Sequence, residues 1–153
     1  MKGTTHVPMA IATNLVVCNI LGQPLDLLNY GLLVGCSTFG GLVPDIDHAG
    51  SQFGSKVPIV AKLFKHRGFT HTVWFALITY ILLTNTNEQV STYIAIGCIS
   101  HIIGDILTPM GLRPFKVLGR FDIHICIPII QNEIIEKIIA TGLYIIIPFL
   151  IVK

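Results

Sequence analysis

Residues 40–50 read GGLVPDIDHAG and place the side chains of Asp45, Asp47 and His48 directly after an apolar run. Only 12% of the 153 residues are charged, so this concentration of ionisable groups is unusual for the chain. An average soluble protein has roughly 25% charged residues. The stretch therefore marks the end of an apolar segment and the start of a candidate functional site.

Apolar residues dominate the remainder of the sequence. The hydrophobic fraction is 52% and the mean hydropathy is +0.75. A helix needs roughly 20 mostly apolar residues to cross a bilayer, and five runs approach that length. They lie at about residues 7–21, 28–43, 70–84, 92–108 and 134–152. The sequence predicts an all-α fold: a polytopic membrane helix bundle of about five transmembrane helices, forming a single domain over residues 1–153.

The distribution of basic residues predicts the orientation of this bundle in the membrane. Basic side chains precede the first run and occupy the two long loops: Lys2, Lys56, Lys62, Lys65, Arg67, Arg113, Lys116 and Arg120. The short connections GQPLDL and NTNEQVS have none. The positive-inside rule then predicts a cytoplasmic amino terminus and a carboxyl terminus outside. The lipid bilayer is the expected partner, and a net charge of +2 does not favour nucleic acid.

Histidine and aspartate side chains from four segments are predicted to meet at the cytoplasmic end of the bundle. His6 lies just before the first run, and PDIDH closes the second. HRGFTH opens the third, and SHIIGDILTPMG closes the fourth. The seven candidate ligands are His6, Asp45, Asp47, His66, His71, His101 and Asp105.

An ionisable residue inside a membrane helix is costly unless it is paired, hydrated or bound to a ligand. A divalent metal ion is the partner that would satisfy all four segments. Imidazole and carboxylate ligands favour zinc, with manganese, iron or magnesium as alternatives. Seven candidates exceed the requirement of one tetrahedral ion, so the sequence predicts one or two ions.

Each group of residues also has a structural interpretation. His101 and Asp105 share one helix face and could bond to each other, while Thr70 could cap the third helix. Asp45 and Asp47 are expected in an extended turn after Pro44, so that both reach one site. The side chains expected to have only a structural role are His124, Asp122 and the four cysteines Cys18, Cys36, Cys98 and Cys126.

Two further residues are predicted to take part in catalysis. Arg67, at the amino end of the third helix, would stabilise the charge of a phosphate group. His48 would act as general base or general acid, because a water activated by a metal needs a nearby proton acceptor.

The motifs LVPDIDH, HRGFTHT and SHIIGDILTPMG, with His6 upstream, resemble a bacterial inner-membrane family described as predicted membrane-bound metal-dependent hydrolases. The resemblance extends from His6 to about residue 130. It implies a hydrolase in the bacterial inner membrane, with the His and Asp residues above as its site.

The leading hypothesis is a membrane hydrolase that uses metal-activated water on a phosphoester of a lipid or another membrane-associated substrate. One alternative is a divalent-metal or proton transporter, although the outer halves of the helices offer mainly Asn and hydroxyl groups. The other is a scaffold whose polar cluster only holds helices together. HExxH and GxSxG motifs are absent, which disfavours the usual zinc peptidases and serine hydrolases.

Overall fold

The computed structural model describes residues 1–59, 66–117 and 122–151. These residues contain five complete α-helices: α1 Gly3–Ile20, α2 Leu27–Leu42, α4 Val73–Thr84, α5 Glu88–Ile106 and α6 Glu133–Ile151. Two short 3₁₀ turns, η1 Val43–Asp47 and η2 Phe69–His71, follow α2 and precede α4. Within the described ranges the β-structure is limited to one isolated bridge, between Leu112 and Ile125. The predicted all-α class is confirmed.

Two helix boundaries differ from the prediction in ways that affect the candidate site. Helix α1 begins at Gly3, so His6 lies inside the helix and is buried. Helix α4 begins at Val73, and its cap is Thr72, whose side chain accepts a hydrogen bond from the Phe75 backbone N–H. The predicted cap, Thr70, is therefore wrong, and its hydroxyl is free for another contact.

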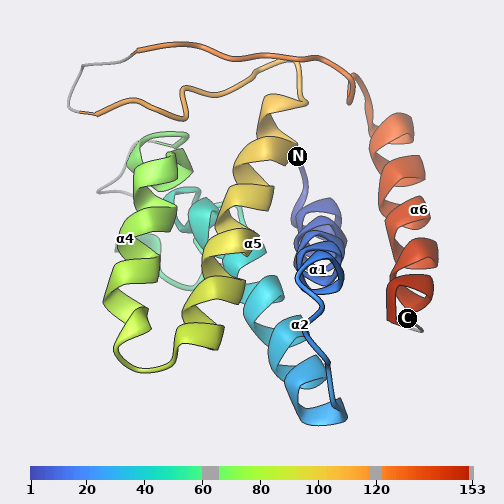
Figure 1. The fold of residues 1–153 in the computed structure, drawn as a ribbon. Coiled ribbons are helices and arrows are strands. Elements are labelled where there is room, and N and C mark those ends of the chain that lie inside the picture. The colour runs from blue at the N-terminus through green and yellow to red at the C-terminus, as the bar shows by residue number, and fades with distance from the viewer. Residues whose placement is uncertain (60–65, 118–121, 152–153) are drawn as a thin grey trace.

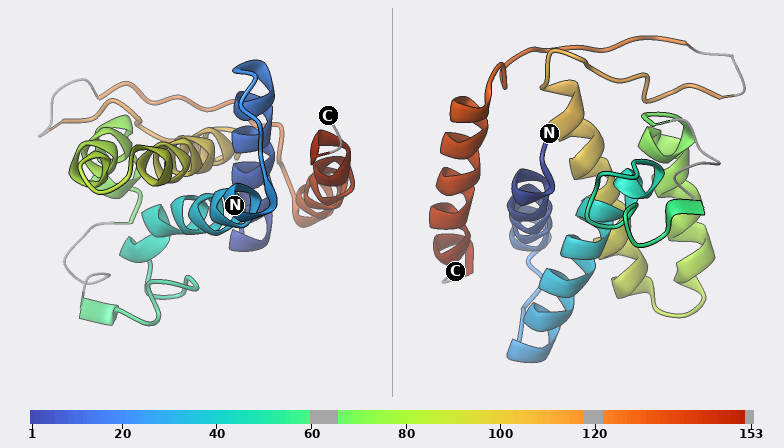
Figure 2. Two further views of the ribbon diagram at one scale, coloured as in Figure 1. Left: turned by 60° about the horizontal axis from the view of Figure 1, so that its bottom comes forward. Right: turned by 180° about the vertical axis from the view of Figure 1, so that it is seen from behind.

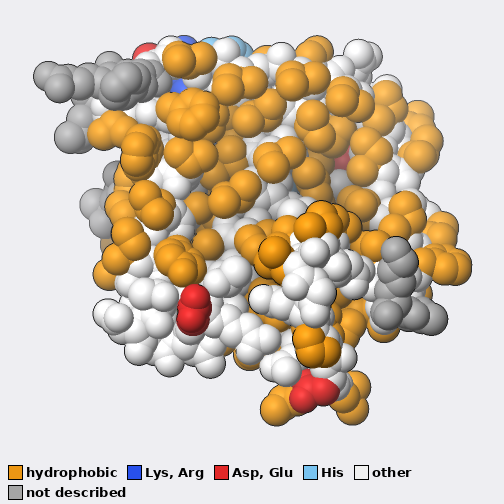
Figure 3. Space-filling view, viewed as in Figure 1, with side chains coloured by type: hydrophobic (Ala, Val, Ile, Leu, Met, Phe, Trp, Pro, Cys, Tyr) orange, Lys and Arg blue, Asp and Glu red, His pale blue; other side chains and the backbone are white. Residues whose placement is uncertain are grey.

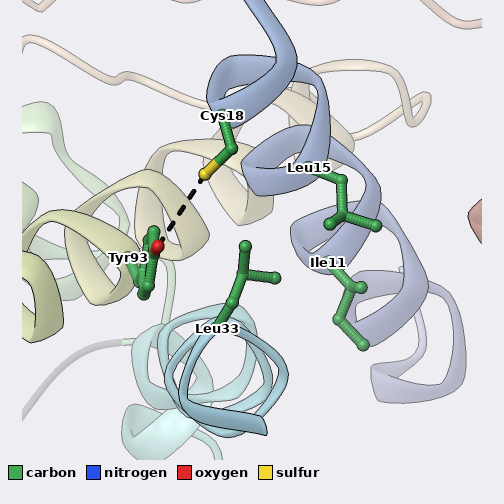
Figure 4. Close-up of a cluster of buried hydrophobic side chains, with 5 residues drawn as sticks. All are labelled: Ile11, Leu15, Cys18, Leu33 and Tyr93. Atoms are coloured by element: carbon green, nitrogen blue, oxygen red, sulfur yellow. Dashed lines mark hydrogen bonds between the residues drawn. The ribbon is translucent and has the colours of Figure 1, made fainter. Parts of the chain in front are cut away.

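Helices α1, α2 and α5 pack against one another in the centre of the bundle (Figures 1 and 2). Helix α4 packs on α5, and α6 packs on α1. A core of buried apolar side chains joins the three central helices (Figure 4). It consists of Ile11, Leu15, Cys18, Leu33 and Tyr93.

The face of the bundle seen in Figure 3 is largely apolar. Helix α6 buries none of its residues, and large side chains such as Leu82 on α4 and Phe149 on α6 are about 70% exposed or more. Such a surface is typical of contact with lipid. In the described part of the chain, two stretches are long and apolar enough to cross a membrane: Leu27–Asp47, with 21 residues, and Glu133–Ile151, with 19. The runs predicted at about residues 7–21, 70–84 and 92–108 also form helices, namely α1, α4 and α5. These helices do not meet the same criterion of length and hydropathy.

A buried amide links the three central helices. Asn14 on α1 donates hydrogen bonds to the Ser37 hydroxyl on α2, at 2.9 Å, and to the Tyr93 carbonyl on α5, at 3.1 Å. Polar side chains of this kind connect helices where water is excluded.

The close approach of α2 and α5 depends on two glycines that face each other, Gly40 and Gly97. A Cβ atom on Gly40 would lie 2.3 Å from the Ile94 carbonyl oxygen, and one on Gly97 would lie 3.0 Å from the Gly40 backbone. The contact brings the end of α2, and hence η1, beside α5.

We expect Gly40→Ala to destabilise the protein, because backbone atoms of α5 would have to move away. Overpacking of this kind costs about 1–3 kcal/mol. Thermal unfolding in detergent would measure the loss. Gly35→Ala on the same helix is the matched control, because nothing lies within 4 Å of its added Cβ. Equal stability of the two variants would contradict the close contact.

Candidate metal centre

The candidate site lies where η1, η2, the carboxyl end of α5 and the first turns of α1 meet. The structure brings all seven predicted ligands to this end of the bundle. They form two compact groups, in each of which one potential ligand atom per residue lies within 4.8 Å of the others. One group is Asp45, Asp47, His66 and His71, and the other is His6, His101 and Asp105.

Four atoms from three elements converge across these two groups: Asp45 Oδ1, His71 Nε2, His101 Nε2 and Asp105 Oδ2. Five of their six separations lie between 3.3 and 3.9 Å. Tetrahedral zinc with ligand bonds of about 2.0–2.2 Å separates its ligand atoms by roughly 3.3–3.6 Å. Three of the five separations fall within this range and the two to Asp105 exceed it by 0.1 and 0.3 Å, so the spacing is close to that of ligands around a single ion.

Hydrogen bonds fix which nitrogen of each histidine faces this centre. His101 Nδ1 lies 2.8 Å from the Gly41 carbonyl oxygen, which can only accept, so Nδ1 carries a proton. His71 Nδ1 lies 3.0 Å from the Thr70 hydroxyl oxygen and 3.2 Å from Asp47 Oδ2. The Thr70 hydroxyl donates its own proton to Asp47, so both neighbours can accept and this Nδ1 also carries a proton. In the neutral rings both Nε2 atoms are therefore acceptors, yet they lie 3.3 Å apart and close to two carboxylates. Such a set of acceptors is stable only with positive charge among them, from a bound cation or from a proton on one of the rings.

The charges around His71 also favour positive charge at this centre. Burial opposes a positive charge on this ring, but the Asp45 and Asp47 carboxylates raise the pKa of His71 to about 9. This side chain is 1% exposed, so solvent does little to screen the carboxylates. The centre favours positive charge, which either a proton on His71 or a metal ion can supply.

His6 adds a second nitrogen donor beside the four atoms. Its ring stacks on His101 with centroids 3.6 Å apart, and His6 Nε2 lies 3.4 Å from Asp105 Oδ1. Both ring nitrogens are buried, and neither makes a hydrogen bond to the described residues. Buried polar atoms of this kind are rare in folded proteins and commonly indicate an ion or a water. Asp105 thus presents one oxygen to His6 and the other to His71 and His101.

Asp45 and Asp47 lie in the 3₁₀ turn η1, so the predicted extended turn is wrong. Pro44, at the start of η1, has the fixed φ that suits a first helical turn. The two carboxylates still approach one target: Asp45 Oδ1 lies 3.4 Å from Nε2 of His71, and Asp47 Oδ2 lies beside its Nδ1. They contact opposite ends of the same ring.

Arg67 and His48 line a cavity of about 400 Å³ that opens beside Asp45 and Asp105. Arg67 Nη2 lies 3.4 Å from Asp105 Oδ2, and its Nη1 donates to the Gly111 carbonyl at 3.1 Å. Its backbone has a φ of 59°, in the left-handed region that non-glycine residues rarely adopt. His48 accepts a hydrogen bond at Nδ1 from the Gly50 backbone N–H, at 2.8 Å. Both predicted catalytic residues are therefore at the site.

Several groups that contact the site residues were not among the predicted site residues. The Thr70 hydroxyl donates to Asp47 Oδ2 at 2.5 Å, and the Gly41 carbonyl accepts from His101. The Met1 amino group lies 3.0 Å from Asp105 Oδ1. Thr70 could have been considered because it precedes His71 in the HRGFTH motif, but the sequence gives no sign of the Gly41 contact.

The residues assigned a structural role lie outside the four-atom centre. Asp122 pairs with Arg113 and Lys116 on the loop between α5 and α6, and His124 bonds to the Met110 carbonyl. The four cysteines are free; Cys18 and Cys98 are buried, whereas Cys36 and Cys126 are half-buried. The predicted basic residues Lys62, Lys65 and Arg120 lie outside the described residues.

Comparisons with known proteins agree with an inner-membrane location. The family model described as YdjM inner membrane protein matches residues 1–152. The uncharacterized protein YvsG of Bacillus subtilis is 30% identical over 152 residues, which cover 94% of this chain and 89% of that protein. The inner membrane protein YdjM of Escherichia coli is 33% identical over 118 residues, covering 68% of this chain and 59% of its own length.

No solved structure matches the chain. The family match covers nearly every residue, and it includes all four segments that form the candidate metal centre. The chain therefore belongs to the YdjM family of inner membrane proteins.

Proposed function

We propose that this protein is an integral membrane metal-dependent hydrolase that cleaves a phosphoester of a lipid or another membrane-associated substrate. The observation that carries the proposal is the convergence of Asp45, His71, His101 and Asp105, whose facing atoms have the spacing of ligands around one ion. A divalent ion bound there would polarise a phosphate oxygen and activate a water molecule for attack.

Two imidazoles and two carboxylates form a ligand set that suits zinc. Manganese and iron accept the same ligands, whereas magnesium prefers an all-oxygen environment. His6 Nε2 lies near Asp105 Oδ1, whereas His71 lies near Oδ2, so His6 and Oδ1 offer a partial second site that shares this carboxylate. The Met1 amino group occupies the same oxygen in this structure. The arrangement is compatible with one or two ions.

Arg67 is the residue that would bind the phosphate. Its Nε atom is buried with no hydrogen-bond partner among the described residues, and its side chain lines the cavity next to Asp105. A guanidinium group with an unused donor matches the oxygens of a phosphate.

His48 would donate a hydrogen bond to the substrate rather than accept a proton. The Gly50 N–H occupies the Nδ1 lone pair, so a neutral His48 carries its proton on Nε2. Of the two roles expected from the sequence, general base or general acid, this tautomer favours the one that donates a proton.

We further propose that all five helices span the bacterial inner membrane, with the candidate centre near the cytoplasmic face. Lys2, Arg113 and Lys116 lie toward the end of the bundle that holds the centre, and the connections at the opposite end, residues 21–26 and 85–87, have no basic residue. This placement supports a cytoplasmic amino terminus.

A transport function receives less support. Beyond the centre, the buried polar side chains Asn14 and Ser37 bond to each other and to backbone atoms, which ties the helices together rather than forming a path of ionisable groups. Uptake of metal into liposomes that contain the protein, above that of protein-free liposomes, would favour transport instead.

The protein purified in detergent is expected to retain divalent metal in a stoichiometric amount and to hydrolyse a phosphoester. A chelator should abolish hydrolysis and lower the unfolding temperature, because an ion bound only by the folded state stabilises that state. Metal analysis, a phosphoesterase assay and thermal unfolding measure these effects. Unchanged thermal stability on chelation, together with no retained metal, would instead support a scaffold.

A further inference from the structure

Asp47 is surrounded by hydrogen-bond donors. Its Oδ2 accepts from the Thr70 hydroxyl at 2.5 Å and from the Arg67 backbone N–H at 3.1 Å, and His71 Nδ1 lies 3.2 Å away. Its Oδ1 lies 3.0 Å from His66 Nδ1. The side chain is fully buried, so water does not compete for these contacts.

This arrangement leaves Asp47 little capacity to bind an ion. A carboxylate oxygen has about two lone-pair sites. Three donors already surround Oδ2, and the backbone N–H of Arg67 and the hydroxyl of Thr70 would lose their partner if a metal displaced them. Asp45 is different, because its Oδ1 faces the Nε2 atoms of His71 and His101 across the centre.

The Asp47 carboxylate determines the tautomer of two histidines at once. The carboxylate can only accept, and it takes the proton of the Thr70 hydroxyl, whose oxygen lies 3.0 Å from His71 Nδ1. Asp47 and Thr70 together therefore keep the proton of His71 on Nδ1 and direct the Nε2 lone pair to the centre. The Asp47 carboxylate also holds the proton of His66 on Nδ1, which leaves His66 Nε2 as an acceptor on a ring that lines the cavity. Metal-bound histidines almost always have such a partner on the second nitrogen.

We infer that Asp47 is a positioning residue that orients His71 toward the metal and His66 toward the substrate cavity, and that neither Asp47 nor His66 is a metal ligand. The inference rests on the proposed metal centre, and it divides the seven predicted ligands by role. Asp45, His71, His101 and Asp105 bind the ion, and His6 lies beside them. Asp47 and His66 act outside this set.

Cobalt(II) titration of the chelated, detergent-purified protein would test the assignment, because the visible absorption bands of cobalt respond to the identity and number of its ligands. Asp47→Asn is expected to lower cobalt affinity about 10- to 100-fold while leaving the bands unchanged. His66→Ala should also leave the bands unchanged, with cobalt affinity close to that of the wild type.

Asp45→Asn is the matched comparison, since it makes the same chemical change two residues away. It should shift the cobalt bands or abolish binding, because a ligand is replaced. Bands of Asp47→Asn or His66→Ala that shift as those of Asp45→Asn do would overturn the inference while leaving the metal centre intact. A wild-type protein that binds no cobalt would instead overturn the proposed metal centre itself. Thermal unfolding of each metal-free variant would show whether it is folded.

Discussion

Replacing His101 by Ala is expected to reduce metal affinity by more than about 100-fold, which is the upper end of the effect of losing an outer-shell partner. His101 Nε2 faces His71 Nε2 at 3.3 Å and Asp45 Oδ1 at 3.6 Å, so its loss removes one of four converging ligand atoms. Hydrolysis should fall together with the metal content. Metal analysis after purification and a titration with zinc would measure both effects.

His124→Ala is the control for the His101 variant. His124 is an exposed histidine on the loop between α5 and α6, and among the described residues its ring bonds to a backbone carbonyl, that of Met110. Its replacement should leave metal content and hydrolysis at wild-type levels. Because His101→Ala also leaves the Gly41 carbonyl without its donor, its folding should be checked by size-exclusion chromatography. A folded His101→Ala protein with full metal content would contradict the proposed centre.

Replacing Arg67 by Gly is expected to lower kcat for a phosphoester by about 10²–10³-fold, the usual cost of losing one donor to a developing negative charge. Metal content should remain at the wild-type level. The left-handed backbone of Arg67 costs an arginine of order 1–3 kcal/mol, whereas glycine adopts it readily. Arg67→Gly therefore removes the guanidinium while relieving backbone strain. Its unfolding temperature should exceed that of Arg67→Ala, which keeps the strain.

Arg113→Ala is the matched control for charge, since Arg113 pairs with Asp122 on the loop between α5 and α6 and is half exposed. It should leave kcat unchanged. Full hydrolysis of phosphoesters by Arg67→Gly would remove the support for phosphate and direct attention to amides or carboxyl esters. Steady-state kinetics with the three variants and the wild type would decide between these outcomes.

The helices could be predicted because apolar runs of this length have few alternatives to a helix in a membrane. The ends of the helices were less predictable, since they depend on single contacts. Thr70 and Thr72 are equally good caps by residue type, but the Thr70 hydroxyl is used by Asp47, so the helix starts after Thr72. Helix α1 starts at Gly3, so His6, which was expected just before the helix, lies within its first turns and is buried.

The set of residues at the site could be predicted, but their individual roles could not. Asp45 and Asp47 are the same residue type in one motif, but Asp45 faces Nε2 of His71 and of His101, whereas Asp47 faces Nδ1 of His71 and accepts hydrogen bonds from Thr70 and Arg67. The orientation of His101 depends on the Gly41 carbonyl, which is brought near by the close packing of Gly40 against Gly97. A linear pattern contains no information about either contact.

The four converging atoms come from Asp45, His71, His101 and Asp105, which span much of the chain and belong to η1, η2 and α5. The proposed centre is complete only after α5, which carries His101 and Asp105, has been synthesised and has packed beside η1 and η2. Metal loading would thus serve as a late checkpoint of membrane insertion, and a ribosome-stalled chain that ends before His101 should bind no ion tightly.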